Sequence, residues 1–176
     1  MVAIGIVALG GGGSGSDSTT DPTAGAPPPV TAPAPPLGAA EAAPCAKVLA
    51  ELPVQLGALN PRVVHTESPY VAAWGDPAVV LRCGVDRPKS LTAGSSAEFI
   101  NGGDLAGPYF DVTRSRDGNV YTTVDRGPYI SITVPTKYQG GTVLPPLATA
   151  IAKALPPVCS TDPDEPDPDK LCTRRK

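Results

Sequence analysis

The sequence predicts an α+β fold in which two helices flank a small antiparallel sheet, made of a three-stranded meander plus a central buried strand. Three observations support this prediction. Apolar and polar residues alternate in three successive segments between residues 108 and 135, and a continuous apolar run occupies residues 79–81. Apolar residues at helical spacing lie near both ends of the same region.

The meander carries the clearest pattern. In its first strand Phe110 and Val112 alternate with polar neighbours, and the Asp117-Gly118 pair that follows is typical of a hairpin turn. The next two strands alternate in the same way. Val120, Thr122 and Val124 are expected on one side of the second strand, and Ile130, Ile132 and Val134 on one side of the third. Three such strands are expected to pair antiparallel and to bury one face.

The remaining elements are bounded by proline and glycine. A first helix is expected from Pro44 to the residue before Pro53, because proline suits a first helical turn and disfavours helix in the residue before it. An extended piece at 62–66 and the buried strand at 79–81 follow. The second helix is expected to start at Pro145-Pro146 and to stop at Pro156, with Leu147, Ile151, Ala154 and Leu155 on one face.

Composition divides the chain into four parts. Residues 1–9 are apolar but too short to cross a bilayer, which needs about 20 residues, so they are interpreted as the end of a longer signal or anchor segment. Residues 10–43 are a Gly/Ser/Pro-rich linker expected to stay outside the fold. Residues 44–159 form the single domain, and residues 160–176 a flexible tail with acidic and then basic residues.

Charge and cysteine usage narrow the class of protein. Residues 45–160 contain ten Lys or Arg and nine Asp or Glu, and they include no basic stripe. Nucleic-acid binding is therefore not expected. The four cysteines include no closely spaced pair, which disfavours a structural zinc site and favours disulfides in an oxidising compartment. The chain is therefore expected to be extracytoplasmic, either secreted or anchored to a membrane through its N-terminal segment only.

Four cysteines permit three pairings, and spacing alone does not choose among them. Cys45–Cys83 would join the first helix to the central strand, and Cys159–Cys172 would close a local loop beyond the last helix. This pairing is the one expected here. The rival joins Cys45 to Cys159 at the outer ends of the two helices and leaves Cys83 to the tail or as a buried thiol.

Several segments resemble a known family. They are CAKVLAELP, AAWGDPAVVLRCGV, an Asn-Gly element before a strand, and VYTTVDRGPYISITVP. Together they cover most of residues 45–155 and resemble the actinobacterial secreted or membrane-anchored proteins of domain-of-unknown-function family 3515. In that family a second tryptophan usually follows the Asn-Gly element, whereas this chain reads INGGDLAGPYF. The resemblance implies an envelope location and no established activity.

The candidate binding residues lie in two short motifs. In Trp74-Gly75-Asp76-Pro77 the tryptophan is a possible stacking platform, with Asp76 and Arg82 as polar anchors, and Arg126 lies in the later Asp-Arg-Gly-Pro connection. The alternative interpretation, which we favour, is a tight turn whose tryptophan fills the core and a charged connection between strands.

The function expected from these residues is a non-catalytic envelope module that binds an envelope protein or a cell-wall polymer, without a cofactor or metal. His65 is the only imidazole, no nucleophile elbow accompanies it, and the acidic tail lacks the glycine and glutamate of a calcium loop. The alternative is a hydrolase or transferase that uses carboxylates. The acids open to that role are Asp76, Asp104, Asp111 and Asp125.

Overall fold

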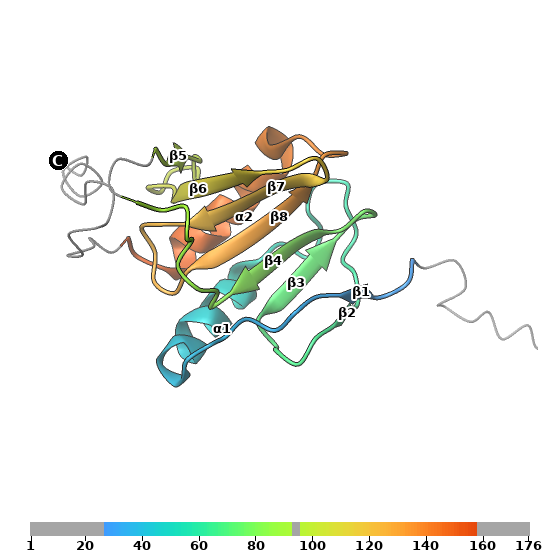
Figure 1. Cartoon of the computed structure of the whole chain (residues 1–176), viewed down its shortest axis with the longest axis horizontal. Helices are drawn as coiled ribbons and strands as arrows, with labels where there is room; N and C mark the ends of the chain where they lie inside the picture. Colours follow the sequence, from blue (N-terminus) through green and yellow to red (C-terminus); the bar gives the residue numbers. More distant parts are fainter. Residues whose placement is uncertain (1–26, 93–95, 158–176) are drawn as a thin grey trace, which may run out of the picture.

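A computed structural model describes residues 27–92 and 96–157 of the chain. The expected α+β class is confirmed, with both α-helices on one face of a sheet (Figure 1). The expected signal or anchor segment (1–9), the whole expected tail (160–176) and the proposed Cys159–Cys172 pair lie outside the described residues. In the described ranges, neither helix has the length and apolar character that crossing a bilayer demands.

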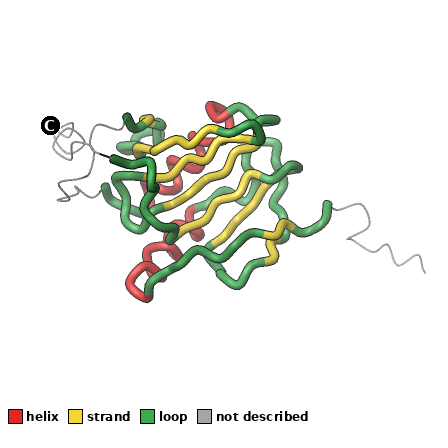
Figure 2. The backbone as a smooth tube through the Cα atoms, viewed as in Figure 1, coloured by secondary structure: helices red, strands yellow, loops and turns green. Residues whose placement is uncertain are grey.

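The sheet is larger than expected, and the three-stranded meander plus one strand must be corrected to six antiparallel strands in the order β3-β4-β8-β7-β6-β5 (Figure 2). The strands are β3 (Val71–Trp74), β4 (Val79–Cys83), β5 (Glu98–Phe99), β6 (Tyr109–Arg114), β7 (Gly118–Thr123) and β8 (Ile130–Pro135). The expected central strand is β4, and the expected meander corresponds to β6, β7 and β8 inside this sheet. The additions are β3 and β5, which extend the sheet at its two edges.

The two added strands lacked a clear sequence pattern. β3 is rich in alanine, a residue with low strand propensity, and β5 has only two residues. β3 pairs with β4 through a short turn at Gly75–Ala78, with Trp74 opposite Val79. The segment containing the Trp-Gly-Asp-Pro motif is therefore a β-hairpin between two sheet strands.

One face of the sheet forms the core with the helices. Leu81 pairs with Ile132, and Ile132 pairs with Tyr121, so these three side chains form one row on the covered face. All three are buried, as are Ile130 and Val134 on the same strand. The period-2 alternation read from the third meander strand thus identifies the face that packs on the helices.

The helices are α1 (Ala42–Glu51) and α2 (Gly140–Ala154), and they pack against each other. α1 ends before Pro53 as expected, with Leu52 extended. α2 begins five residues before Pro145-Pro146, so the expected start at these prolines is wrong. Both prolines lie inside the helix without an N–H to donate, and the buried face of the helix, from Val143 to Ile151, compensates for the missing bonds.

The second half of the expected linker lies against the domain, contrary to the expectation that residues 10–43 stay outside the fold. Strand β1 (Val30–Thr31) pairs in parallel with β2 (Val64–His65). After it, Leu37 packs over Gly84 so closely that a Cβ at residue 84 would lie 2.0 Å from the Leu37 Cδ1 atom. The 3-10 helix η1 (Ala39–Glu41) then leads into α1. An extended proline-rich segment can make such contacts because its backbone is already in strand-like geometry.

A disulfide bond joins the helical layer to the sheet. Cys45 in the first turn of α1 is bonded to Cys83 at the end of β4, and both side chains are fully buried. This is the pairing expected from the positions of the first helix and central strand. The bond closes a loop with a sequence separation of 38 residues.

We predict that the double substitution Cys45→Ala/Cys83→Ala lowers the free energy of unfolding by about 3–4 kcal/mol, because the unfolded chain regains the freedom of the closed loop. Urea denaturation of the variant and of the wild type under non-reducing conditions measures this loss. The matched control is Cys159→Ala/Cys172→Ala, which is expected to change stability little because it leaves the α1–β4 bond intact. Equal losses in the two variants would contradict the prediction.

Candidate functional site

The four expected binding residues do not converge on one site. Trp74 belongs to the core, Asp76 lies exposed in the β3–β4 turn, and Arg126 is fully buried after β7. Arg82 lies on β4, on the face of the sheet that the helices leave open, since its neighbour Leu81 faces the helices. The Trp-Gly-Asp-Pro and Asp-Arg-Gly-Pro motifs therefore serve different parts of the fold.

Trp74 packs as a core residue. Its side chain is almost completely buried, and its indole N–H donates to the carbonyl oxygens of Pro53 and Val54, each at 3.2 Å. These bonds tie the segment after α1 to the edge of the sheet and satisfy the polar atom of a buried ring. The ring is therefore not exposed for stacking on a ligand.

Asp76 takes part in a surface contact with Arg62. The Arg62 Nη1 atom lies 3.4 Å from Asp76 Oδ1 and also donates to the Gly75 carbonyl, while Nη2 donates to the Pro28 carbonyl of the N-terminal segment. The Asp76 side chain is 70% exposed, so the ion pair itself contributes little to stability. The role of Arg62 is to hold together the β3–β4 turn and the residues before β1.

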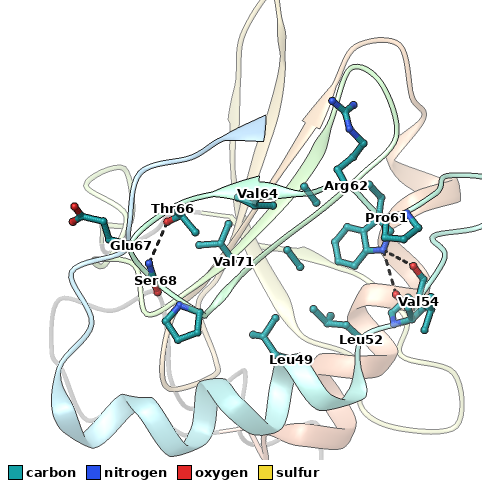
Figure 3. Close-up of a pocket in the computed structure, with 15 residues that line it drawn as sticks. Leu49, Leu52, Val54, Pro61, Arg62, Val64, Thr66, Glu67, Ser68 and Val71 are labelled. Atoms are coloured by element: carbon teal, nitrogen blue, oxygen red, sulfur yellow. Dashed lines mark hydrogen bonds between the residues drawn. The ribbon is translucent and has the colours of Figure 1, made fainter. Parts of the chain in front are cut away.

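A groove of about 650 Å³ lies between the C-terminal end of α1 and strands β2 and β3 (Figure 3). Most of its lining residues are apolar, among them Leu49 and Leu52 from α1 and Val64 and Val71 from the strands, but polar and apolar atoms contribute about equally to its surface. The full lining comprises Leu49, Leu52, Pro53, Val54, Pro61, Arg62, Val64, Thr66, Glu67, Ser68, Pro69, Val71, Ala72, Ala73 and Trp74. The groove exists because α1 covers the sheet only up to its edge strand β3.

One exposed apolar side chain lines this groove, and a second belongs to the adjoining segment. Val54 lines it and is 79% exposed, and Val63, which is 66% exposed, lies between the lining residues Arg62 and Val64. Polar groups occur at both ends: at one, Ser68 N–H bonds to Thr66 Oγ1 and Glu67 extends away from the groove, and at the other lies Arg62 (Figure 3). The groove therefore has an aliphatic middle between two polar ends.

Asp125 and Arg126 form a buried ion pair in the connection after β7. Arg126 Nη1 donates to Asp125 Oδ2, and Nη2 donates to the Ala106 carbonyl at 2.8 Å. Asp125 also accepts from the Tyr109 backbone N–H at 2.9 Å. Burial raises the pKa of the Asp125 carboxyl above its ordinary value of 3.8, and the Arg126 charge opposes that rise. The pair fixes the chain before β6 to the end of β7.

The acids proposed for catalysis are separately engaged or exposed. Asp111 Oδ2 accepts a 2.7 Å bond from Ser90 Oγ, and Asp125 is held by Arg126. The strand register places Asp111 opposite Thr122, three residues before Asp125. Asp76 and Asp104 are exposed in separate turns. Among residues 27–92 and 96–157, no group of three or more His, Cys, Asp or Glu is arranged to hold a metal ion.

These features define a disulfide-bonded α+β domain with helices on one face of an antiparallel sheet. A family model described as "Protein of unknown function (DUF3515)" matches residues 2–159, and the chain belongs to this family. No curated protein matches the chain, and no solved structure matches it.

Two features of the structure were not predicted from the sequence: the groove and the buried hydroxyl of Ser131. The groove combines residues from α1, β2 and β3, and the strand β3 that sets its edge was not predicted. Ser131, whose hydroxyl is buried without a hydrogen-bond partner, sits in an alternating strand where a polar residue is ordinarily exposed. Its only sequence signal was its position beside Ile130 and Ile132.

We predict that Arg126→Met lowers the free energy of unfolding by about 3–5 kcal/mol, because it leaves the Asp125 carboxylate buried and unpaired. The variant should also lose stability more steeply than the wild type as pH rises above 3.8, since protonated Asp125 is the form that tolerates burial. Chemical denaturation at a series of pH values from acid to neutral measures both effects.

The double variant Asp125→Asn/Arg126→Met is the control. It should recover part of the lost stability and the steep pH dependence should disappear, because residue 125 no longer carries a carboxylate. If the single and double variants showed the same stability at neutral pH, the ion pair would have no role of this kind.

Proposed function

We propose that the protein is an extracytoplasmic, membrane-tethered and non-catalytic module, and that its groove binds apolar side chains of an envelope protein. The observation that carries this proposal is the groove between α1, β2 and β3, together with the exposed valines beside it. The membrane enters the proposal only through the N-terminal segment.

The size and lining of the groove support binding. Its volume falls within the range of about 300–1,000 Å³ that is usual for ligand sites, and its lining combines aliphatic side chains with polar ones such as Arg62 and Ser68. Exposed apolar residues that extend beyond a concave site favour a protein partner, whose surface can cover Val54 and Val63 as well as the groove.

A protein partner is also favoured over a cell-wall polymer. The ring that the sequence offered as a stacking platform, Trp74, is 2% exposed. The groove wall instead includes aliphatic side chains such as Leu49, Leu52 and Val71, which suit aliphatic or aromatic side chains of a polypeptide. Catalysis is not proposed, because Asp111 and Asp125 each have a structural partner.

The extracytoplasmic location is supported by the Cys45–Cys83 bond, since such bonds persist in oxidising compartments. We predict that a phosphatase active only outside the cytoplasm, fused after Lys176 of the chain with its upstream codons, shows activity in intact cells. A fusion that lacks the N-terminal apolar segment is the control and should be inactive. A stable full-length fusion without activity would contradict the location.

The groove is tested by photo-crosslinking in intact cells. We predict that a photoreactive residue at Val54 forms a discrete adduct with another protein, and that Val63→Asp in the same chain reduces this adduct by at least about tenfold, because a charge beside the groove opposes apolar contact. Both positions are exposed, so neither change should alter the melting temperature.

The matched control carries the photoreactive residue at Phe99, which is 50% exposed on the opposite edge strand β5. It should not give the Val54 adduct. The proposal fails if both positions give the same adducts, if Val63→Asp has no effect, or if the adduct is a second copy of this chain.

A further inference from the structure

A row of four polar residues crosses the open face of the sheet. Arg82 on β4 pairs with Ser131 on β8, Ser131 pairs with Thr122 on β7, and Thr122 pairs with Asp111 on β6. Residues paired in this way point to the same face and lie about 5 Å apart. This polar row faces away from α1 and α2, which lie behind the sheet in Figure 1.

The polar row is more buried than an open sheet face requires. Ser131 is 3% exposed, and Thr122 and Asp111 are each 8% exposed. The chain after β4 covers this region, since Leu91 is buried and Ser90 donates to Asp111. Asp111, at one end of the row, therefore already has a partner.

The other end of the row lacks such partners. The Ser131 Oγ atom is buried and makes no hydrogen bond within the described part of the chain. The Arg82 guanidinium makes no hydrogen bond or ion pair to any residue in 27–92 or 96–157. A buried hydroxyl without a partner costs about 1–3 kcal/mol, and an arginine side chain beside it is a ready donor for an acceptor ligand.

Both residues line a hollow of about 280 Å³. Thr122 completes its polar floor, while Pro36 from the N-terminal segment and Val85 after β4 belong to its sides. The hollow is distinct from the groove between α1, β2 and β3, because its floor consists of β4, β8 and β7 on the open face of the sheet.

We infer that this hollow binds a carboxylate group, with Arg82 as the main contact and the hydroxyls of Ser131 and Thr122 as further donors. A guanidinium pairs with the two oxygens of a carboxylate through parallel N–H bonds. Asp86 also lines the hollow and is exposed there, and its negative charge opposes a doubly charged phosphate more than a singly charged carboxylate. The inference does not depend on the groove or on a protein partner.

The test is a titration of the purified full-length chain, ¹⁵N-labelled, followed by NMR through the Arg82 side-chain Nε–H and the backbone amides of Ser131 and Thr122. Two carboxylates serve as probes: N-acetylalanine, which represents a peptide terminus, and glucuronate, which represents an acidic sugar. Saturable shifts with either one, at constant ionic strength, support the site, and the tighter of the two identifies the source of the carboxylate.

Arg82→Gln is expected to weaken the affinity by at least about tenfold, and Ser131→Ala by a few-fold, without loss of the dispersed spectrum. Arg116→Gln, an exposed arginine in the β6–β7 turn, is the matched control and should bind as the wild type does. Shifts that do not saturate, that chloride or phosphate reproduces equally, or that persist in Arg82→Gln would overturn the inference. None of these outcomes bears on crosslinking at the groove, so the two proposals can fail separately.

Discussion

The packing of α1 against the covered face of the sheet is the contact on which the other features depend. Cys45 and Val48 of α1 are fully buried, and the Cys45–Cys83 bond fixes this helix to β4 in covalent form. Because α1 is fixed there, its C-terminal end lies beside β3, and the following segment receives the Trp74 indole N–H. The groove is the space that remains between these fixed parts.

The sequence predicted the elements whose burial follows a simple period. Ile130, Ile132 and Val134 alternate with shorter or polar residues, and this alternation alone identifies β8 and its covered face. Helix α1 was predicted because proline marks both of its ends. The Cys45–Cys83 pair agreed with the spatial relation of these two predicted elements.

Other elements depend on tertiary contacts that leave no local pattern. The alanines of β3 form a strand because β4 supplies a hydrogen-bonding partner. The proline-rich segment at residues 30–37 is held by pairing with β2 and by the contact of Leu37 with Gly84. Pro145 and Pro146 ordinarily mark a helix start, yet the burial of Val143 and Leu144 carries the helix further upstream. For the candidate sites the limit was similar, because the groove depends on the unpredicted strand β3 and the polar row joins β4 to β8, which is distant in the chain.

The docking of the proline-rich segment changes how the domain is held. Residues 27–37 lie along the fold, so they remove about 35 Å of reach from any tether that begins upstream. The chain enters the domain at Pro28, whose carbonyl is bonded to Arg62, a residue that also lines the groove. If the chain is tethered upstream as proposed, tension on the tether would act on Arg62, and so on the rim of the groove.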